Sequence, residues 1–72
     1  MIQAPEVAAK NIILIMQSYF QAKPGGSVTI SNILNVWTLQ MCWRIDDYHS
    51  GKVYGEVHGW FEEVGESIKL TV

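Results

Sequence analysis

Three side chains of kinds that often do chemistry, Cys42, Asp46 and His49, are spaced by four and then three residues. On a helix this spacing would place a thiol, a carboxylate and an imidazole on one face. Such a face would suit a metal ion, or a Cys–His pair oriented by a carboxylate. Structural zinc sites, however, usually draw four ligands from two segments, and cysteine often serves as a small apolar side chain. We therefore expect no metal, no cofactor and no catalytic residue, and we do not expect the chain to be an enzyme.

Two further patterns resemble chemical motifs more weakly. Gly55, Gly59 and Gly65 lie four and six residues apart in a region that we expect to be a β-hairpin. No helix is expected after them, so no helix N-terminus would be available to hold a phosphate. The pairs Asp46 and Asp47, and Glu62 and Glu63, are adjacent residues whose side chains point in different directions. We expect these carboxylates to be solvated.

Charge is distributed very unevenly along the chain. Between Asn11 and Trp43 the only charged side chain is Lys23, whereas nine of the twelve charged residues lie from Arg44 onward. A 72-residue domain has far more surface than interior, so the uncharged half cannot all be core. We expect part of it to be covered by a second copy of the chain, another protein or a lipid.

Length and composition favour one globular domain over residues 1–72, with 49% apolar residues. The longest apolar run of the uncharged half, residues 12–16, is far shorter than the roughly 20 residues that a membrane span requires. Residues 1–10 lack the basic and apolar regions of a signal peptide, and the lone Cys42 has no partner for an internal disulfide. We therefore expect a cytoplasmic protein with no membrane span.

The first half predicts a helix followed by a short strand. Pro5 suits the first turn of a helix. The apolar residues that follow recur every three or four positions, which predicts an amphipathic helix to about Ala22: Ala8, Ile12, Ile15, Met16, Tyr19 and Phe20. The Pro24, Gly25 and Gly26 sequence ends it. Residues 27–30 then alternate polar and β-branched side chains, which predicts a strand.

Residues 32–49 contain no glycine or proline and show a helical pattern. They predict either one helix or two helices with a break near Thr38. In both readings Met41, Ile45 and Tyr48 face inward, whereas Leu39 and Trp43 lie outside the core. We expect Ser50 and Gly51 to end this segment, since glycine closes many helices.

The last third predicts a β-hairpin. Residues 53–61 alternate with a period of two, and residues 67–72 do so again, with Ile68, Leu70 and Val72 on one face. Residues 62–65 are interpreted as the turn between the two strands.

The order of helix, short strand, helical segment and hairpin resembles the winged-helix superfamily. The segments VTIS at residues 28–31, RIDDY at 44–48 and GKVYG at 51–55 fit this pattern, since many winged helices enter the wing through a similar phrase. The resemblance implies a small α+β domain. It also implies a nucleic-acid face on the recognition helix that includes Gln40, Trp43, Arg44 and Asp47, with Lys52 nearby. The alternative fold is a helical hairpin packed on a β-hairpin.

Two functions follow from these observations. The first is a non-catalytic interaction module that docks a protein partner or a second copy, as a homodimer or larger, through apolar surface that includes Leu39, Trp43, Tyr54 and Trp60. The second is a small winged-helix DNA-binding regulator that uses Gln40, Arg44 and Lys52. The net charge of −2 and the scattered basic residues favour the first, because DNA-binding proteins usually concentrate Lys and Arg on one face.

Overall fold

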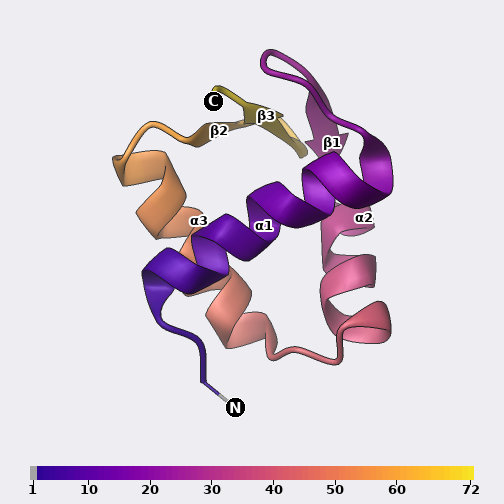
Figure 1. Cartoon of the computed structure of the whole chain (residues 1–72), viewed down its shortest axis with the longest axis vertical. Coiled ribbons are helices and arrows are strands. Elements are labelled where there is room, and N and C mark those ends of the chain that lie inside the picture. The colour runs from indigo at the N-terminus through magenta and orange to yellow at the C-terminus, as the bar shows by residue number, and fades with distance from the viewer. Residues whose placement is uncertain (1) are drawn as a thin grey trace.

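The chain begins with the helix that the apolar spacing predicts. The computed structural model describes residues 2–72, and in it α1 spans Pro5–Phe20 with the proline in its first turn. The helix ends where Gln21 adopts a left-handed conformation (φ 55°) and the Ala22 amide donates to the Met16 carbonyl at 2.9 Å. In Figure 1, α1 crosses the front of the molecule, with α3 behind one of its ends and α2 beside the other.

The segment expected to be helical over residues 32–49 is two helices. Strand β1 (Ser27–Thr29) leads into α2 (Ile30–Asn35), which continues as a π-helical turn, η1, over Val36–Gln40. The break lies over residues 41–44 and so begins three residues after Thr38. The Met41 amide donates to the Val36 carbonyl at 2.9 Å, and Cys42 adopts a left-handed φ of 55°. This wide turn ends the first helix without a glycine or proline.

The second helix, α3, spans Ile45–Val57, so the predictions that Gly51 ends a helix and that a strand begins near Val53 are wrong. Gly51 lies in the middle of α3 against α1, where an added Cβ would lie 2.7 Å from atoms of Ala8 and Ala9. Gly55 lies directly beneath the Phe61 ring. These glycines permit close packing between elements. Residues 53–57 are helical, so the alternation of polar and apolar side chains there does not reflect a strand.

The hairpin is shorter than predicted. Strands β2 (Phe61–Val64) and β3 (Ser67–Leu70) form it, and we call this hairpin, residues 61–70, the wing. Residues 62–64 belong to β2, so the predicted turn over residues 62–65 is wrong by three residues; Gly65, at a φ of 60°, makes the turn with Glu66. The sheet order is β1-β3-β2 and both pairs are antiparallel, with Val28 opposite Ile68.

This arrangement is a small, winged-helix-like α+β domain: helix, strand, two helices and a hairpin (Figure 1). The strand preceding α2 joins the sheet, so the alternative of a helical hairpin on an isolated β-hairpin is set aside. Within residues 2–72, no helix combines the length and the apolar character needed to cross a membrane.

The core lies between α1, α2 with η1, α3 and the sheet, and its largest buried side chains are Trp37, Tyr48 and Phe61. The indole N–H of Trp37 donates to the Arg44 carbonyl at 2.7 Å and so fixes the turn between the two helices. Tyr48 faces inward, as predicted. Ile45, predicted to face inward, is instead 47% exposed, because α3 begins only at this residue and turns it toward solvent.

Candidate interaction surface on α3

The thiol, carboxylate and imidazole singled out by their spacing do not share a helix. Cys42 lies in the turn before α3, whereas Asp46 and His49 are on α3 itself. Among residues 2–72, no group of three His, Cys, Asp or Glu side chains is arranged to hold a metal ion. The spacing of four and three residues therefore brings no chemical site together.

The four predicted interface residues lie in different surroundings. Leu39, in the π-helical turn, is 72% exposed, which confirms its position outside the core. Trp43 is only half-buried, yet it packs edge-on against Trp37, with 4.8 Å between ring centroids. The expectation that Trp43 lies outside the core is therefore corrected, because the turn over residues 41–44 brings its ring onto Trp37.

The other two, Tyr54 and Trp60, contact each other where α1, α3 and β2 meet. Their ring centroids lie 5.5 Å apart, and the ring of His58 stacks on Tyr54 at 4.0 Å. The Tyr54 hydroxyl donates to the Glu6 carboxylate at 3.2 Å. Hydrogen bonding to Lys10 and its charge lower the pKa of Glu6, while burial and the hydrogen bond to Glu6 raise the pKa of Tyr54. This cluster ties the start of α1 to the end of α3.

The residues proposed to contact nucleic acid differ in their exposure and in their ion pairs. Lys52 is largely buried, with its ammonium 3.0 Å from a Glu56 oxygen and 2.5 Å from a Glu63 oxygen. The hydrogen bond to Glu63 is the largest cause that raises the Lys52 pKa. Arg44, at the N-cap of α3, lies 3.5 Å from the Asp46 carboxylate. Gln40 is exposed but lies in the π-helical turn before α3.

Asp47 also departs from the position that the winged-helix resemblance implied. Instead of facing outward on the recognition helix it is buried, 5% exposed, and one of its carboxylate oxygens has no hydrogen-bond partner. Its place in the first turn of α3 puts the negative charge at the positive end of the helix. Asp47 is therefore unavailable to a bound ligand.

The exposed side of α3 carries apolar residues and no lysine or arginine. We call it the outer face of α3, and it consists of Ile45, Asp46, His49, Ser50, Val53 and Val57. Val53 is 60% exposed and Val57 is 76% exposed. The strand interpretation missed them, although Ile45, His49, Val53 and Val57 recur every fourth residue, which is the spacing of a helical stripe.

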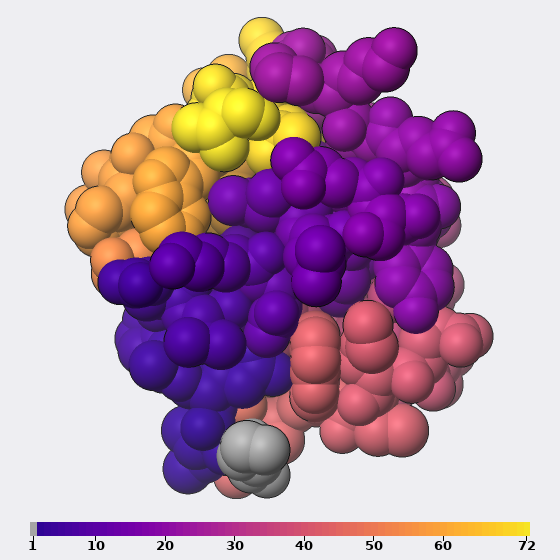
Figure 2. All heavy atoms as spheres, viewed as in Figure 1, coloured from indigo at the N-terminus to yellow at the C-terminus, as the bar shows by residue number. Residues whose placement is uncertain are grey.

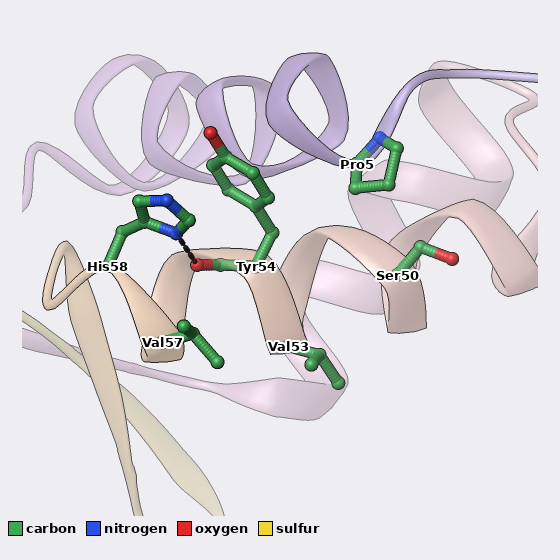
Figure 3. Close-up of a pocket in the computed structure, with 6 residues that line it drawn as sticks. All are labelled: Pro5, Ser50, Val53, Tyr54, Val57 and His58. Carbon is green, nitrogen blue, oxygen red and sulfur yellow. Dashed lines mark hydrogen bonds between the residues drawn. The ribbon is translucent and has the colours of Figure 1, made fainter.

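An open depression of about 470 Å³ lies along this helix (Figure 3). It is lined by Pro5, Ser50, Val53, Tyr54, Val57 and His58. In Figure 3 the rings of Tyr54 and His58 rise from α3 toward α1, while Val53 and Val57 project from another side of the same helix. The depression is thus mostly apolar and open to solvent.

The uncharged half of the chain does not form a comparable apolar surface. Figure 2 shows α1 and the segment after it covering the front of the molecule. Ten large apolar side chains are exposed among residues 2–72, and only Leu14, Tyr19 and Leu39 belong to the uncharged stretch. Most of its other exposed positions are amides, hydroxyls and glycine, which water solvates well. The shortage of charge there therefore does not by itself require a covering partner.

Comparison with known protein families, with curated proteins and with solved structures gave no match.

Proposed function

We propose that this chain is a non-catalytic interaction module, a member of the winged-helix superfamily that binds a protein through the outer face of α3. The occupant is another protein or a second copy of the chain. The observation that carries the proposal is the exposure of Val53 and Val57 on a helix that offers no free cation. Exposed apolar patches of this kind often mark protein interfaces. We place the module in the cytoplasm, where reducing conditions keep an exposed thiol such as Cys42 free.

A DNA-binding regulator is the second candidate, and the fold itself favours it. In helix-turn-helix proteins the second helix of the pair enters the major groove, and α3 occupies that position here. Affinity for DNA, however, comes largely from phosphate contacts made by Lys and Arg. Among the described residues, Lys10, Arg44, Lys52 and Lys69 already have carboxylate partners. We therefore rank protein binding above DNA binding.

An NMR titration of the ¹⁵N-labelled chain tests the proposal. One arm raises the concentration of the chain itself, and the other adds an uncharged amphipathic peptide of Leu and Gln, about 15 residues long so that a helix can form. We expect one arm or both to shift the amide signals of residues 49–58, with a Kd in the range of about 10–100 μM. Val53→Gln should weaken the effect, whereas Leu14→Gln, a similarly exposed residue on α1, should not.

Two results would overturn the proposal. One is the absence of any shift on α3 in both arms. The other is micromolar binding of random duplex DNA with a steep salt dependence, which would move the DNA-regulator function into first place.

A further inference from the structure

We infer that the occupant of the outer face of α3 is a second copy of this chain, whose own α3 runs antiparallel to the first across a two-fold axis beside Val53. This inference rests on the proposed function and narrows its two occupants to one. Three features of the outer face support it: its charge, the place of Val53 on the helix, and the residues on either side of Val53.

The outer face of α3 presents almost no net charge to a partner. Its one charged side chain, Asp46, lies 3.5 Å from the guanidinium group of Arg44, which is exposed beside it. On the flank toward the wing, Lys52, Glu56 and Glu63 are already joined to one another by ion pairs. Such a surface does not repel its own copy, and it does not attract a partner of either charge.

Val53 is the residue of α3 that points most directly away from the core. Asp47, Gly51 and Gly55 belong to the buried side of the helix, and at about 100° per residue Val53 lies almost opposite them. Its side chain is 60% exposed. A residue at a two-fold axis meets its own copy, and an aliphatic side chain can do so without charge repulsion or an unpaired polar group.

The residues on either side of Val53 complement each other when the two helices run antiparallel. Ser50 precedes Val53 and Val57 follows it at a similar spacing, so Ser50 of one copy lies nearly level with Val57 of the other. The depression beside Pro5, Ser50 and Val53 has room for that Val57 side chain, and the reverse contact forms at the same time (Figure 3). The exposed valines of both copies then form one continuous apolar strip.

Antiparallel pairing also suits the charges at the two ends of α3. The first turn carries Asp46 and Asp47, and the last turn carries no basic residue. An antiparallel second copy brings its Arg44 end beside this C-terminal end, where a cation is favourable. A parallel copy would instead place two Asp46 side chains next to each other, which disfavours association.

Two charged variants of one residue, Val53→Lys and Val53→Glu, test for the axis by sedimentation equilibrium. We expect the wild-type chain to dimerise with a Kd of about 100 μM. Each variant alone should associate at least about tenfold more weakly, because like charges would face each other at the axis. An equimolar mixture of the two variants should regain about the wild-type affinity, since opposite charges then meet there.

Matched controls and a distance measurement complete the test. Leu14→Lys and Leu14→Glu change a similarly exposed residue of α1 and should dimerise like the wild type; circular dichroism checks that every variant is folded. The single cysteine, Cys42, is exposed in the turn before α3 and accepts a nitroxide label. Electron spin resonance should give about 35 Å between the two labels, because each lies about 16 Å along the helix from Val53. Parallel pairing would bring the labels within about 20 Å.

The outcomes separate this inference from the proposed function. A chain that stays monomeric at about 1 mM, while the Leu and Gln peptide still shifts the signals of α3, would overturn the second copy and leave the interaction module standing. Self-association that both Val53 variants retain, or that their mixture does not restore, would also overturn the inference, as would a short distance between the labels. If the chain does not self-associate and the peptide does not bind α3, both proposals are wrong.

Discussion

The Lys52 ammonium lies 2.5 Å from a Glu63 carboxylate oxygen and so joins the middle of α3 to the wing. Glu56, one turn further along α3, accepts from the same ammonium at 3.0 Å. Lys52 therefore holds the wing against α3, and the cation that the resemblance assigned to nucleic acid has a structural role.

Removing this cation should destabilise the fold. We expect Lys52→Met to lower the free energy of unfolding by about 1–2 kcal/mol, because two partly buried carboxylates lose a charged hydrogen-bond donor. Lys10→Met is the matched control, since the pair between Lys10 and Glu6 is more exposed and should contribute much less to stability. Urea unfolding measures both. Equal losses in the two variants would contradict the structural role of Lys52.

A buried phenol predicts loss of stability at alkaline pH. Burial raises the pKa of Tyr48 to about 12, from about 10 in an unfolded chain. Because the folded-state pKa is the higher one, the neutral phenol contributes fully below about pH 10, and the contribution is lost as the pH rises toward 12. The raised pKa of Lys52 acts over the same range, and its charge lowers the Tyr48 pKa, so a comparison with a Tyr48 variant measures the phenol together with this interaction.

Tyr48→Phe isolates the contribution of the phenol. The Tyr48 hydroxyl is buried without a hydrogen-bond partner, so its removal should change stability at neutral pH by less than about 1 kcal/mol. Between about pH 10 and 12 the variant should lose less stability than the wild type. Tyr19→Phe, at an exposed position, should follow the wild type. Parallel pH curves for wild type and Tyr48→Phe would show that the phenol does not titrate as described.

Gly51→Ala tests whether α1 and α3 meet as closely as the structure has them. Alanine favours a helix by about 1 kcal/mol over glycine, but its Cβ would lie 2.7 Å from Ala8 and Ala9. We expect the overlap to dominate and to destabilise the fold by about 1–3 kcal/mol. Ser50→Ala, at the neighbouring exposed position, should be nearly neutral. Thermal melts compare the two, and a Gly51→Ala variant more stable than the wild type would contradict the packing.

The edge-on contact between Trp43 and Trp37 predicts that Trp43→Ala mainly affects folding. We expect a loss of about 2 kcal/mol, which is less than for a fully buried tryptophan because the Trp43 ring is only half-buried. Leu39→Ala, at a position 72% exposed, should cost less than about 0.5 kcal/mol. Guanidinium unfolding followed by circular dichroism measures both. A Trp43→Ala variant with wild-type stability would contradict this packing and would favour the expectation that Trp43 is an exposed interface residue.

The sequence predicted those elements whose pattern is local. The three- and four-residue spacing from Ala8 to Met16 follows directly from one buried face of α1, and the alternation near Ile68 follows from a strand with one covered face. The second half of α3 was not predicted because glycines such as Gly51 and Gly55 usually end a helix or lie outside one. Gly51 is required by the approach of Ala8 and Ala9, which are distant in the chain, and Gly55 by the ring of Phe61, which reaches α3 only because the chain turns back after it. Similarly, the turn over residues 41–44, which brings Trp43 onto Trp37, leaves no periodic signal.

The candidate surface was predicted only in its general character. An apolar surface on a helix was expected, and Leu39 is indeed exposed, but Val53 and Val57 were assigned to a strand. Their exposure depends on how α3 is rotated against α1, which is fixed by packing at Gly51 and not by the residues of the stripe.

Parallel anisotropy titrations of labelled random duplex DNA and of the labelled peptide of Leu and Gln, with one preparation of the chain at low salt, test the central claim most directly. We expect the peptide to bind with a Kd of about 100 μM or tighter. The duplex should bind no more tightly than about 10⁻⁴ M, the weak end for non-specific DNA binding. Micromolar binding of the duplex with a steep salt dependence, abolished by Arg44→Glu, together with no binding of the peptide, would contradict a protein-docking role for α3.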